Sequence, residues 1–241
     1  MEILFIADLH LHEKKTDITI GFLKFLKNQA TQARALYILG DFFHYWVGDD
    51  DPNILHKAVA YELKKLYEKG VLCYFIHGNR DFLLGKTFAK KSRMILLPKE
   101  KVIKLYGHQI LILHGDILCT DDISYQRYRK RIRSRWLQKI FLDLPLSIRH
   151  FLAKKIRKNS QSVSLLKQKY ITDVNEKTVI EKFKKYKVDW IIHGHTHRPA
   201  IHKIIINGKI LHRGVLGAWQ KNGSAIRITN KTIELINFSL H

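Results

Sequence analysis

The sequence predicts an α/β sandwich, and three observations support this fold class. Short apolar runs rich in β-branched residues recur along the chain, and most of them end in a polar cluster. Two segments between the first runs carry apolar residues at three- and four-residue spacing, as amphipathic helices do. The runs of the second half are closely spaced and joined by turn signals, which indicates hairpins that close a second sheet.

The predicted elements follow in a regular order. Helical patterns lie at residues 19–32 and 53–69, so the chain begins as β-α-β-α-β. Asn207-Gly208 is one of the turn signals that join the later strands. Strands are expected at residues 3–7, 35–39, 71–76, 101–105, 109–113, 190–193, 203–206, 210–213, 225–229 and 232–238.

One segment departs from this order and predicts an inserted helical cap. Between residues 125 and 169 there are 14 Lys or Arg and a single acid, Asp143, interleaved with large apolar side chains at mostly helical spacing. Helices with one apolar and one basic side suit an anionic membrane surface. The alternative is an ordinary surface helix whose apolar stripe packs on the core. We assign residues 1–121 and 172–241 to a catalytic core and residues 122–171 to the cap.

The chain is strongly basic. It has 43 Lys and Arg against 21 Asp and Glu, a formal net charge of +22. This charge favours a polyanionic partner, either nucleic acid or an anionic membrane, although a general enrichment of surface Lys gives the same number. Charge alone leaves these alternatives open.

Three features predict a protein kept in the cytoplasm. Only two cysteines occur, Cys73 and Cys119, both within apolar stretches, which argues against a disulfide framework. The apolar run at residues 3–6 reads as a buried strand and leaves no room for a signal peptide. No apolar run reaches the roughly 18 residues that a membrane-spanning helix needs.

Metal-competent side chains fall almost entirely at predicted strand ends, where α/β sheets build their sites. Carboxylates mixed with imidazoles suit Mn²⁺, Fe or Zn²⁺, and one Asp can bridge two such ions at roughly 3.5–4 Å. Each block alone is weak, since Asp-x-His also occurs in turns and Gly-His-x-His in surface loops. Their order and placement together predict a two-metal phosphoesterase. The blocks are Asp8-Leu9-His10, Gly40-Asp41, Gly78-Asn79-Arg80-Asp81, His114-Gly115-Asp116 and Gly194-His195-Thr196-His197.

Other polar residues lack this context. The remaining histidines are interpreted as structural or surface residues, and His193 is expected inside the strand before the final block. Asp49 and Asp50 have no ligand spacing, so we interpret them as turn residues or as residues that support the ligands.

The five blocks resemble those of the calcineurin-like metallophosphoesterases, over residues 8–197. Further segments are similar to the UDP-2,3-diacylglucosamine diphosphatase family of lipid A biosynthesis, over nearly the whole chain. This resemblance implies a four-layer αββα sandwich with the helical cap inserted into it. The segments are GDFFHYWVGDD at residues 40–50, GNRDFLLG at 78–85, TDVN at 172–175, GHTHRPA at 194–200 and VLGAW at 215–219.

The resemblance implies a dinuclear site for two Mn²⁺ ions, with other divalent metals possible. Asp41 would bridge the two ions. One ion would be held by Asp8, His10, Asp41 and His197, and the other by Asp41, Asn79, His114 and His195.

The resemblance also implies which groups meet the substrate. Asn79, Arg80 and His195 would act in catalysis. Arg80 stands where many relatives have a proton-donating His, and because a guanidinium does not readily release a proton, it would stabilise phosphate charge instead. Two departures from the family pattern, His44 for an acid and Ser164 for Asn, fall on the sugar side. The expected contacts are Asn79, Arg80, Asp122, Arg157, Ser160, Ser164, Lys167 and His195.

The activity implied is Mn²⁺-dependent hydrolysis of the pyrophosphate bond of UDP-2,3-diacylglucosamine, by water attack on the α-phosphorus. The products would be UMP and 2,3-diacylglucosamine 1-phosphate. The enzyme would be a monomer, bound peripherally to the cytoplasmic face of the bacterial inner membrane, with the cap receiving the acyl chains.

Two alternatives compete with this activity. One is a nuclease or nucleotide phosphodiesterase of the same superfamily. No nucleic-acid partner is expected, because the charge is concentrated in an amphipathic insert instead of a groove with exposed aromatics. The other is a scaffold that has lost catalysis, which fits poorly because none of the expected ligands is missing.

Overall fold

Two β-sheets form the centre of the computed structural model, which describes residues 2–166 and 172–240, without the side chains of residues 161–166. The larger sheet contains, in spatial order, β11 (Ile233–Ser239), β10 (Asn222–Ile228), β1 (Glu2–Ile6), β2 (Ala33–Ile38), β3 (Leu72–Phe75) and β4 (Ile95–Leu96). The smaller sheet contains β5 (Glu100–Leu105), β6 (His108–Leu113), β7 (Trp190–His193), β9 (Lys209–Val215) and β8 (Ala200–Ile206).

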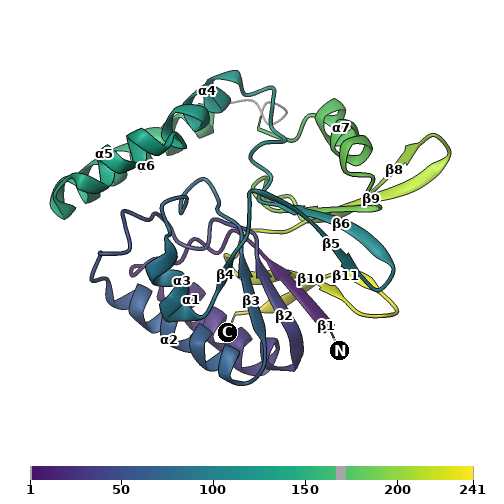
Figure 1. Ribbon diagram of the computed structural model, residues 1–241, viewed down its shortest axis with the longest axis horizontal. Coiled ribbons are helices and arrows are strands. Elements are labelled where there is room, and N and C mark those ends of the chain that lie inside the picture. Colours follow the sequence, from purple (N-terminus) through teal and green to yellow (C-terminus); the bar gives the residue numbers. More distant parts are fainter. Residues whose placement is uncertain (1, 167–171, 241) are drawn as a thin grey trace.

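Helices cover both outer faces, so the expected four-layer αββα sandwich is confirmed (Figure 1). α1 (Thr16–Asn28), α2 (Ile54–Glu68) and α3 (Lys86–Ser92) lie on the larger sheet, and α7 (Glu176–Tyr186) lies on the smaller sheet. A short 3₁₀ helix, η1 (Ala30–Gln32), follows α1. One apolar cluster fills each of the three spaces between layers.

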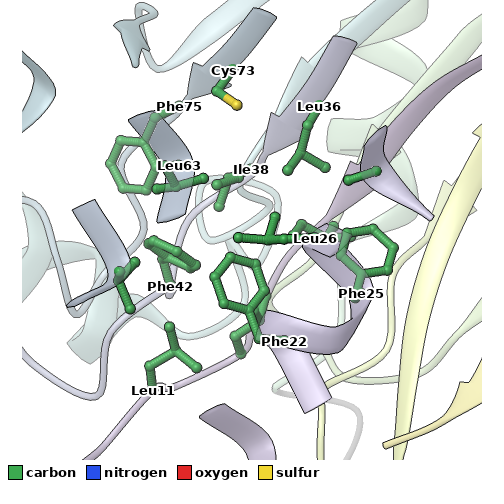
Figure 2. Close-up of a cluster of buried hydrophobic side chains, with 14 of the residues drawn as sticks. Leu11, Phe22, Phe25, Leu26, Leu36, Ile38, Phe42, Leu63, Cys73 and Phe75 are labelled. Atoms are coloured by element: carbon green, nitrogen blue, oxygen red, sulfur yellow. The ribbon is translucent and has the colours of Figure 1, made fainter. Parts of the chain in front are cut away.

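The cluster beneath α1 and α2 shows why these segments form helices. Ile18, Phe22, Phe25 and Leu26 are buried on one side of α1, at the spacing of a helical face. Figure 2 shows Phe22 and Phe25 among aliphatic and aromatic side chains of the neighbouring strands and α2. The ring of Phe22 meets that of Phe42 edge-on, with centroids 5.2 Å apart. This packing fixes the loop after β2, which contains Phe42.

Parallel pairing brings the strand ends of the predicted site to one edge. β1, β2 and β3 are parallel neighbours in the larger sheet, and β6 and β7 are parallel neighbours in the smaller sheet. The loops that follow parallel neighbours begin at the same edge of a sheet, which is where α/β proteins place ligands. The five blocks of the sequence occupy these five loops.

The prediction that the later strands close the second sheet was wrong in part. β8 and β9 join the smaller sheet, and their turn at Asn207-Gly208 has positive φ at both residues, as predicted for a tight hairpin. β10 and β11 instead extend the larger sheet, because β10 pairs antiparallel with β1. Ala225 and Ile226 are buried on opposite faces of β10, which suits a strand inside a sheet covered on both sides.

Other boundaries differ by a few residues. α1 begins three residues before the predicted start and ends at Asn28, since residues 30–32 form the 3₁₀ turn instead. α3 and the two-residue β4 were not predicted, because elements this short carry little periodicity.

The inserted segment forms three helices that extend away from the sandwich as an arm (Figure 1). They are α4 (Ile123–Ile132), α5 (Arg135–Asp143) and α6 (Leu146–Leu166). Neither α4 nor α5 contains a fully buried residue, and Trp136, Ile140 and Phe151 are 64%, 53% and 64% exposed. The alternative interpretation, in which the apolar stripe packs on the core, was therefore wrong for the described side chains.

Polar contacts attach this arm near its bend. Arg149 is buried and donates hydrogen bonds to the carbonyl oxygens of Val47, at 2.7 Å, and Leu144, at 2.9 Å. It also pairs with the carboxylate of Asp50. Asp50 therefore has a structural role as the partner of a cap arginine.

Both cysteines are buried free thiols. Cys73 lies in β3 as predicted, whereas Cys119 lies in the loop before α4 and not in a strand. Within residues 2–166 and 172–240, the helices are too short or too polar to cross a membrane.

The apolar contacts of α1 predict a large effect of one substitution. Phe22→Ala is expected to lower the free energy of unfolding by about 3–5 kcal/mol, because it leaves a cavity beneath the helix. Ile20→Ala on the same helix is the control, since Ile20 is 50% exposed and its loss should cost less than about 0.5 kcal/mol. Urea denaturation followed by circular dichroism measures both. Equal losses for the two variants would contradict the assignment of the buried face.

Candidate metal centre

The loops after β1, β2, β3, β6 and β7 bring all seven predicted ligands together. Their backbone is unusual, because non-glycine residues rarely adopt positive φ, and such conformations cluster at functional sites. The sequence gives no direct sign of this feature. Five of the seven have it: Asp8 at 57°, His10 at 50°, Asp41 at 51°, His195 at 71° and His197 at 57°.

One half of the centre gathers around Asn79. The Oδ1 atom of Asn79 lies 2.9 Å from Nε2 of His114 and 3.0 Å from Nδ1 of His195. The two ring nitrogens are 3.2 Å apart. Oδ1 of Asp41 lies 3.6 Å from the same His114 nitrogen.

The other half gathers around Asp8. Nε2 of His197 lies 3.4 Å from Oδ1 of Asp8 and 3.3 Å from Nε2 of His10. Nδ1 of His10 lies 3.9 Å from Oδ2 of Asp41. The two carboxylate oxygens of Asp41 thus face different halves, which is the position of a bridging ligand.

The donor set fits divalent cations. Nδ1 of His10 is buried without a hydrogen-bond partner among the described residues, and Oδ1 of Asp8 is buried with the 3.4 Å contact of His197. Two pairs of imidazole nitrogens point at each other, at 3.2 and 3.3 Å, and lone pairs in that arrangement need a shared cation or proton. Mixed carboxylate, amide and imidazole donors suit Mn²⁺, Fe and Zn²⁺.

Backbone groups hold the carboxylates and His114 in orientation. Oδ2 of Asp8 accepts the N–H of His195 at 2.7 Å, and Oδ1 of Asp41 accepts the N–H of Arg80 at 2.9 Å. Nδ1 of His114 donates its hydrogen to the carbonyl oxygen of Leu39 at 2.8 Å. The lone pair of Nε2 is then available to a metal ion.

The electrostatics keep both carboxylates ionised. Burial alone would raise the pKa of Asp8, but the hydrogen bond and charge of His197 hold that pKa well below its usual range. For Asp41, burial is likewise outweighed by His114, His10 and Arg80, which lower its pKa. Burial lowers the pKa of His195 to about 4, so its imidazole is neutral at pH 7 and able to bind a metal.

Two glycines let the loops approach closely. A side chain at Gly78 would place its Cβ 2.2 Å from the backbone nitrogen of Asp41. Gly40 has φ of 87°, and a Cβ there would lie 2.5 Å from Gly78. The loops after β2 and β3 therefore cross at a distance that only glycine permits.

Asp81 is a structural residue of the same loops. It is completely buried, and its carboxylate accepts backbone N–H bonds from Gly78 at 2.8 Å and Phe42 at 2.7 Å. It therefore ties the loop of Asn79 to the loop of Asp41. Asp49, which we predicted to be a turn or supporting residue, accepts the backbone N–H groups of Gly85, Thr87 and Phe88 at the start of α3.

Apart from Asn79 and His195, which lie inside the centre, the predicted substrate contacts lie at its rim or in the cap. Nε of Arg80 lies 3.3 Å from Oδ2 of Asp41. Arg157 of α6 is partly buried near Arg80, and burial together with that charge lowers its pKa to about 10, so it remains a cation at pH 7. The same two arginines, together with burial, keep His44 neutral by lowering its pKa to about 3.

The remaining predicted contacts are spread along the cap. The Asp122 carboxylate accepts the backbone N–H of Tyr125 at 3.0 Å and so caps α4. Ser160 is exposed on α6. The side chain of Ser164 and all of Lys167 lie outside the described residues.

The sequence indicated no role for Tyr125, and it placed Asp116 in a metal-competent block without indicating a role of its own. The ring of Tyr125 stacks on His195, with centroids 5.9 Å apart and planes 30° apart. Asp116 is buried and receives hydrogen bonds from Tyr125 and from Arg129. Asp116 stands in the His114-Gly115-Asp116 block, and that neighbourhood was the available signal.

Comparison with known proteins gives the family. The model described as calcineurin-like phosphoesterase matches residues 1–199. Relatives named UDP-2,3-diacylglucosamine hydrolase occur in Photorhabdus laumondii subsp. laumondii (60% identical over 235 residues, 98% of each chain) and Proteus mirabilis (59% over 235 residues, 98% of each). A relative of the same name occurs in Escherichia coli O7:K1, 53% identical over 238 residues and covering 99% of each chain.

A solved structure described as a novel archaeal phosphodiesterase covers 99% of both chains with a TM-score of 0.50. It is 11% identical, so it supports the fold alone.

The sandwich and its donor cluster define a class of protein, the metal-dependent phosphoesterases. Within that class, the chain belongs to the calcineurin-like phosphoesterases and to their UDP-2,3-diacylglucosamine hydrolase family. It is a hydrolase, and its family implies that it works with divalent metal ions.

The crowded donor atoms predict that metal stabilises the fold. Adding Mn²⁺ to metal-free protein at a hundredfold excess over its Kd should raise the stability by about 2.7 kcal/mol per site, seen as a higher Tm. Asp41→Asn should lose most of this rise, because Asp41 faces both halves of the centre. Asp50→Asn, a carboxylate outside the cluster, is the control and should keep it. A full rise in Asp41→Asn, measured by differential scanning calorimetry, would rule out the bridging position.

Proposed function

We propose that this enzyme hydrolyses the pyrophosphate bond of UDP-2,3-diacylglucosamine by water attack on the α-phosphorus, as a step of lipid A biosynthesis. The products are UMP and 2,3-diacylglucosamine 1-phosphate. The proposal is supported most by the clustering of carboxylate, amide and imidazole donors together with relatives of that name at 60% and 59% identity. The proposed cofactor is a pair of Mn²⁺ ions.

The proposed ligands are those of the two halves described above. Asp8, His10, Asp41 and His197 hold one ion, and Asp41, Asn79, His114 and His195 hold the other. Two bound cations supply positive charge that lowers the pKa of a water molecule and offsets the charge of phosphate oxygens.

Residues of the chain then orient the substrate. Arg80 and Arg157 provide fixed positive charge at the rim, where the transferred phosphate accumulates negative charge. Arg80 does not act as a proton donor, since a guanidinium stays protonated at neutral pH. The amide of Asn79 and the neutral imidazole of His195 lie beside that position and offer further hydrogen bonds.

Two features of the cap favour a lipid substrate. Its described part has exposed large apolar residues beside many basic residues, and α6 brings Arg157 from the cap to the vicinity of Arg80. A single arm can therefore contact acyl chains and phosphates together. We further propose that this arm holds the enzyme peripherally on the cytoplasmic face of the inner membrane, as a monomer.

The activity is tested with purified protein, Mn²⁺ and the lipid-linked nucleotide in water labelled with ¹⁸O. We expect UMP and the sugar 1-phosphate as products, with the label in UMP because the α-phosphorus is attacked. Label in the sugar phosphate would contradict the attack position. Cleavage of DNA or RNA without release of UMP would favour the nuclease alternative, and no turnover with any substrate would favour a scaffold.

Substitution of Arg80 tests its electrostatic role. Arg80→Met is expected to lower kcat by about 10²–10³-fold, as the removal of one preorganised donor does elsewhere. Arg80→Lys should recover part of that loss, because it restores the charge without the planar fork. Steady-state kinetics of the two variants are compared with the wild type. An unchanged kcat in Arg80→Met would remove Arg80 from the reaction.

Membrane binding is tested by co-sedimentation with vesicles that contain anionic phospholipid. The variant Lys139→Gln/Lys154→Gln/Lys155→Gln should weaken binding by about 3 kcal/mol, at about 1 kcal/mol for each cation near the surface. Trp136→Ser should also weaken it, whereas Ile205→Ser should not, since Ile205 is 73% exposed on β8, outside the cap. Unchanged binding in the cap variants would contradict the proposal.

A further inference from the structure

Among the described residues, helix α4 of the cap contacts the metal centre on the side of Asn79, His114 and His195. Asp116 follows His114 by two residues, and its carboxylate accepts a hydrogen bond from Arg129 of α4 at 2.5 Å. Tyr125 of α4 stacks on His195, with ring centroids 5.9 Å apart. Arg133, directly after α4, donates to the carbonyl oxygen of Gly78 at 2.8 Å, and Gly78 precedes Asn79. These contacts reach the loops of Asn79, His114 and His195.

Asp116 is the residue at which most of these cap contacts meet. Its side chain is 4% exposed, and Oδ2 accepts the hydroxyl of Tyr125 at 3.2 Å and Nε–H of Arg129 at 2.5 Å. Nη2 of Arg133 lies 3.6 Å from the same oxygen. Gln126 donates to the carbonyl oxygen of Asp116 at 2.8 Å. Four side chains of the cap therefore converge on one buried residue.

The other half of the centre is held differently. Asp8 is fixed by the backbone N–H of His195, and His10 and His197 contact each other and Asp8. Their charged neighbours are Asp41 and Arg80, which belong to the sandwich. In the part of the chain that the structure describes, the contacts given for Asp8, His10 and His197 do not include α4.

This asymmetry has a consequence for metal binding. Groups that orient metal ligands without touching the ion typically change its affinity by about 10–100-fold when they are removed. Loss of these Asp116 contacts would loosen Asn79, His114 and His195, the proposed ligands of one ion. Asp8 and His10 lie on the loop after β1, and His197, although it shares the loop of His195, is held by its contacts with Asp8 and His10.

We propose that Asp116 is a positioning residue through which the cap stabilises one metal position, that of Asn79, His114 and His195, and not the position of Asp8, His10 and His197. The proposal rests on the ligand assignment of the proposed function. The proposal makes the ion at Asn79, His114 and His195 dependent on the contacts of α4. This half of the centre therefore has its full metal affinity only when α4 is bound to Asp116.

The test is Mn²⁺ binding to the full-length Asp116→Asn variant, which keeps the side-chain volume and removes the charge. Isothermal titration calorimetry should show one site with wild-type affinity and one site weakened by about 10–100-fold. Electron paramagnetic resonance gives an independent readout. At two equivalents of Mn²⁺ the variant should show the six-line signal of single ions, where the wild type shows an exchange-coupled pair.

Three further variants separate positioning from general damage. Arg133→Gln removes one of the four cap contacts to Asp116, together with the hydrogen bond to Gly78, and should weaken the same ion. The double variant Asp116→Asn/Arg133→Gln should lose no more than the sum of the single losses. Asp50→Asn weakens the other attachment of the arm, the Arg149 contact, and is the matched control. Circular dichroism establishes that each variant is folded.

The outcomes distinguish a failure of the role of Asp116 from a failure of the two-metal ligand assignment. Equal weakening of both ions in Asp116→Asn, unchanged binding of both, or the same selective loss in Asp50→Asn would overturn the role of Asp116 while the two-metal assignment stands. Failure of the wild type to bind two ions would overturn the ligand assignment and the inference with it.

Discussion

The site depends on keeping two carboxylates, Asp8 and Asp41, ionised and almost completely buried. An isolated buried charge costs several kcal/mol, so the surroundings must supply compensating donors. The fold supplies two backbone N–H groups, from His195 and Arg80, which sit in loops that begin at the same edge of the two sheets. The imidazoles of His10, His114 and His197 provide further compensation. The parallel pairing of β1, β2 and β3, the crossing of Gly40 and Gly78, and the tie through Asp81 all serve this geometry.

The sequence predicted the parts of this arrangement that depend on local pattern. Most strands, and helices α1 and α2, were found to within a few residues, because apolar periodicity reports burial on one face. Helix α7 was not predicted, and the cap helices were predicted without bounds. The blocks at strand ends identified residues that the structure gathers around Asp41, although the binding of metal by them remains a proposal. The placement of β10 beside β1 was not predictable, since that pairing joins residues 3–5 with residues 226–228. The roles of Asp116 and Tyr125 were not predicted for a similar reason. Asp116 is contacted by side chains of α4, and Tyr125 stacks on His195 in the loop after β7, and no spacing rule predicts either contact.

The cap is attached by charge and hydrogen bonds more than by apolar packing. Asp116 holds α4 at one end, and Asp50 and the carbonyl oxygen of Val47 hold Arg149 near the bend. Such buried or half-buried ion pairs contribute little net stability, because desolvation offsets most of the attraction, but they fix one orientation. Large apolar side chains of the arm, such as Trp136 and Phe151, remain exposed as a result.

This division of roles suits the lipid contact that we propose for the arm. If the same apolar residues packed on the sandwich, they would stabilise the fold by about 1.5–3 kcal/mol each and would then be unavailable to acyl chains. Polar anchors at two points leave that surface free and still place Arg157 beside Arg80. Orientation is therefore supplied by a few arginine–carboxylate contacts, whereas the large apolar side chains of the arm stay exposed. The same contacts connect the cap to the loops of Asn79, His114 and His195, so the position of the arm and the geometry of the metal centre are not independent.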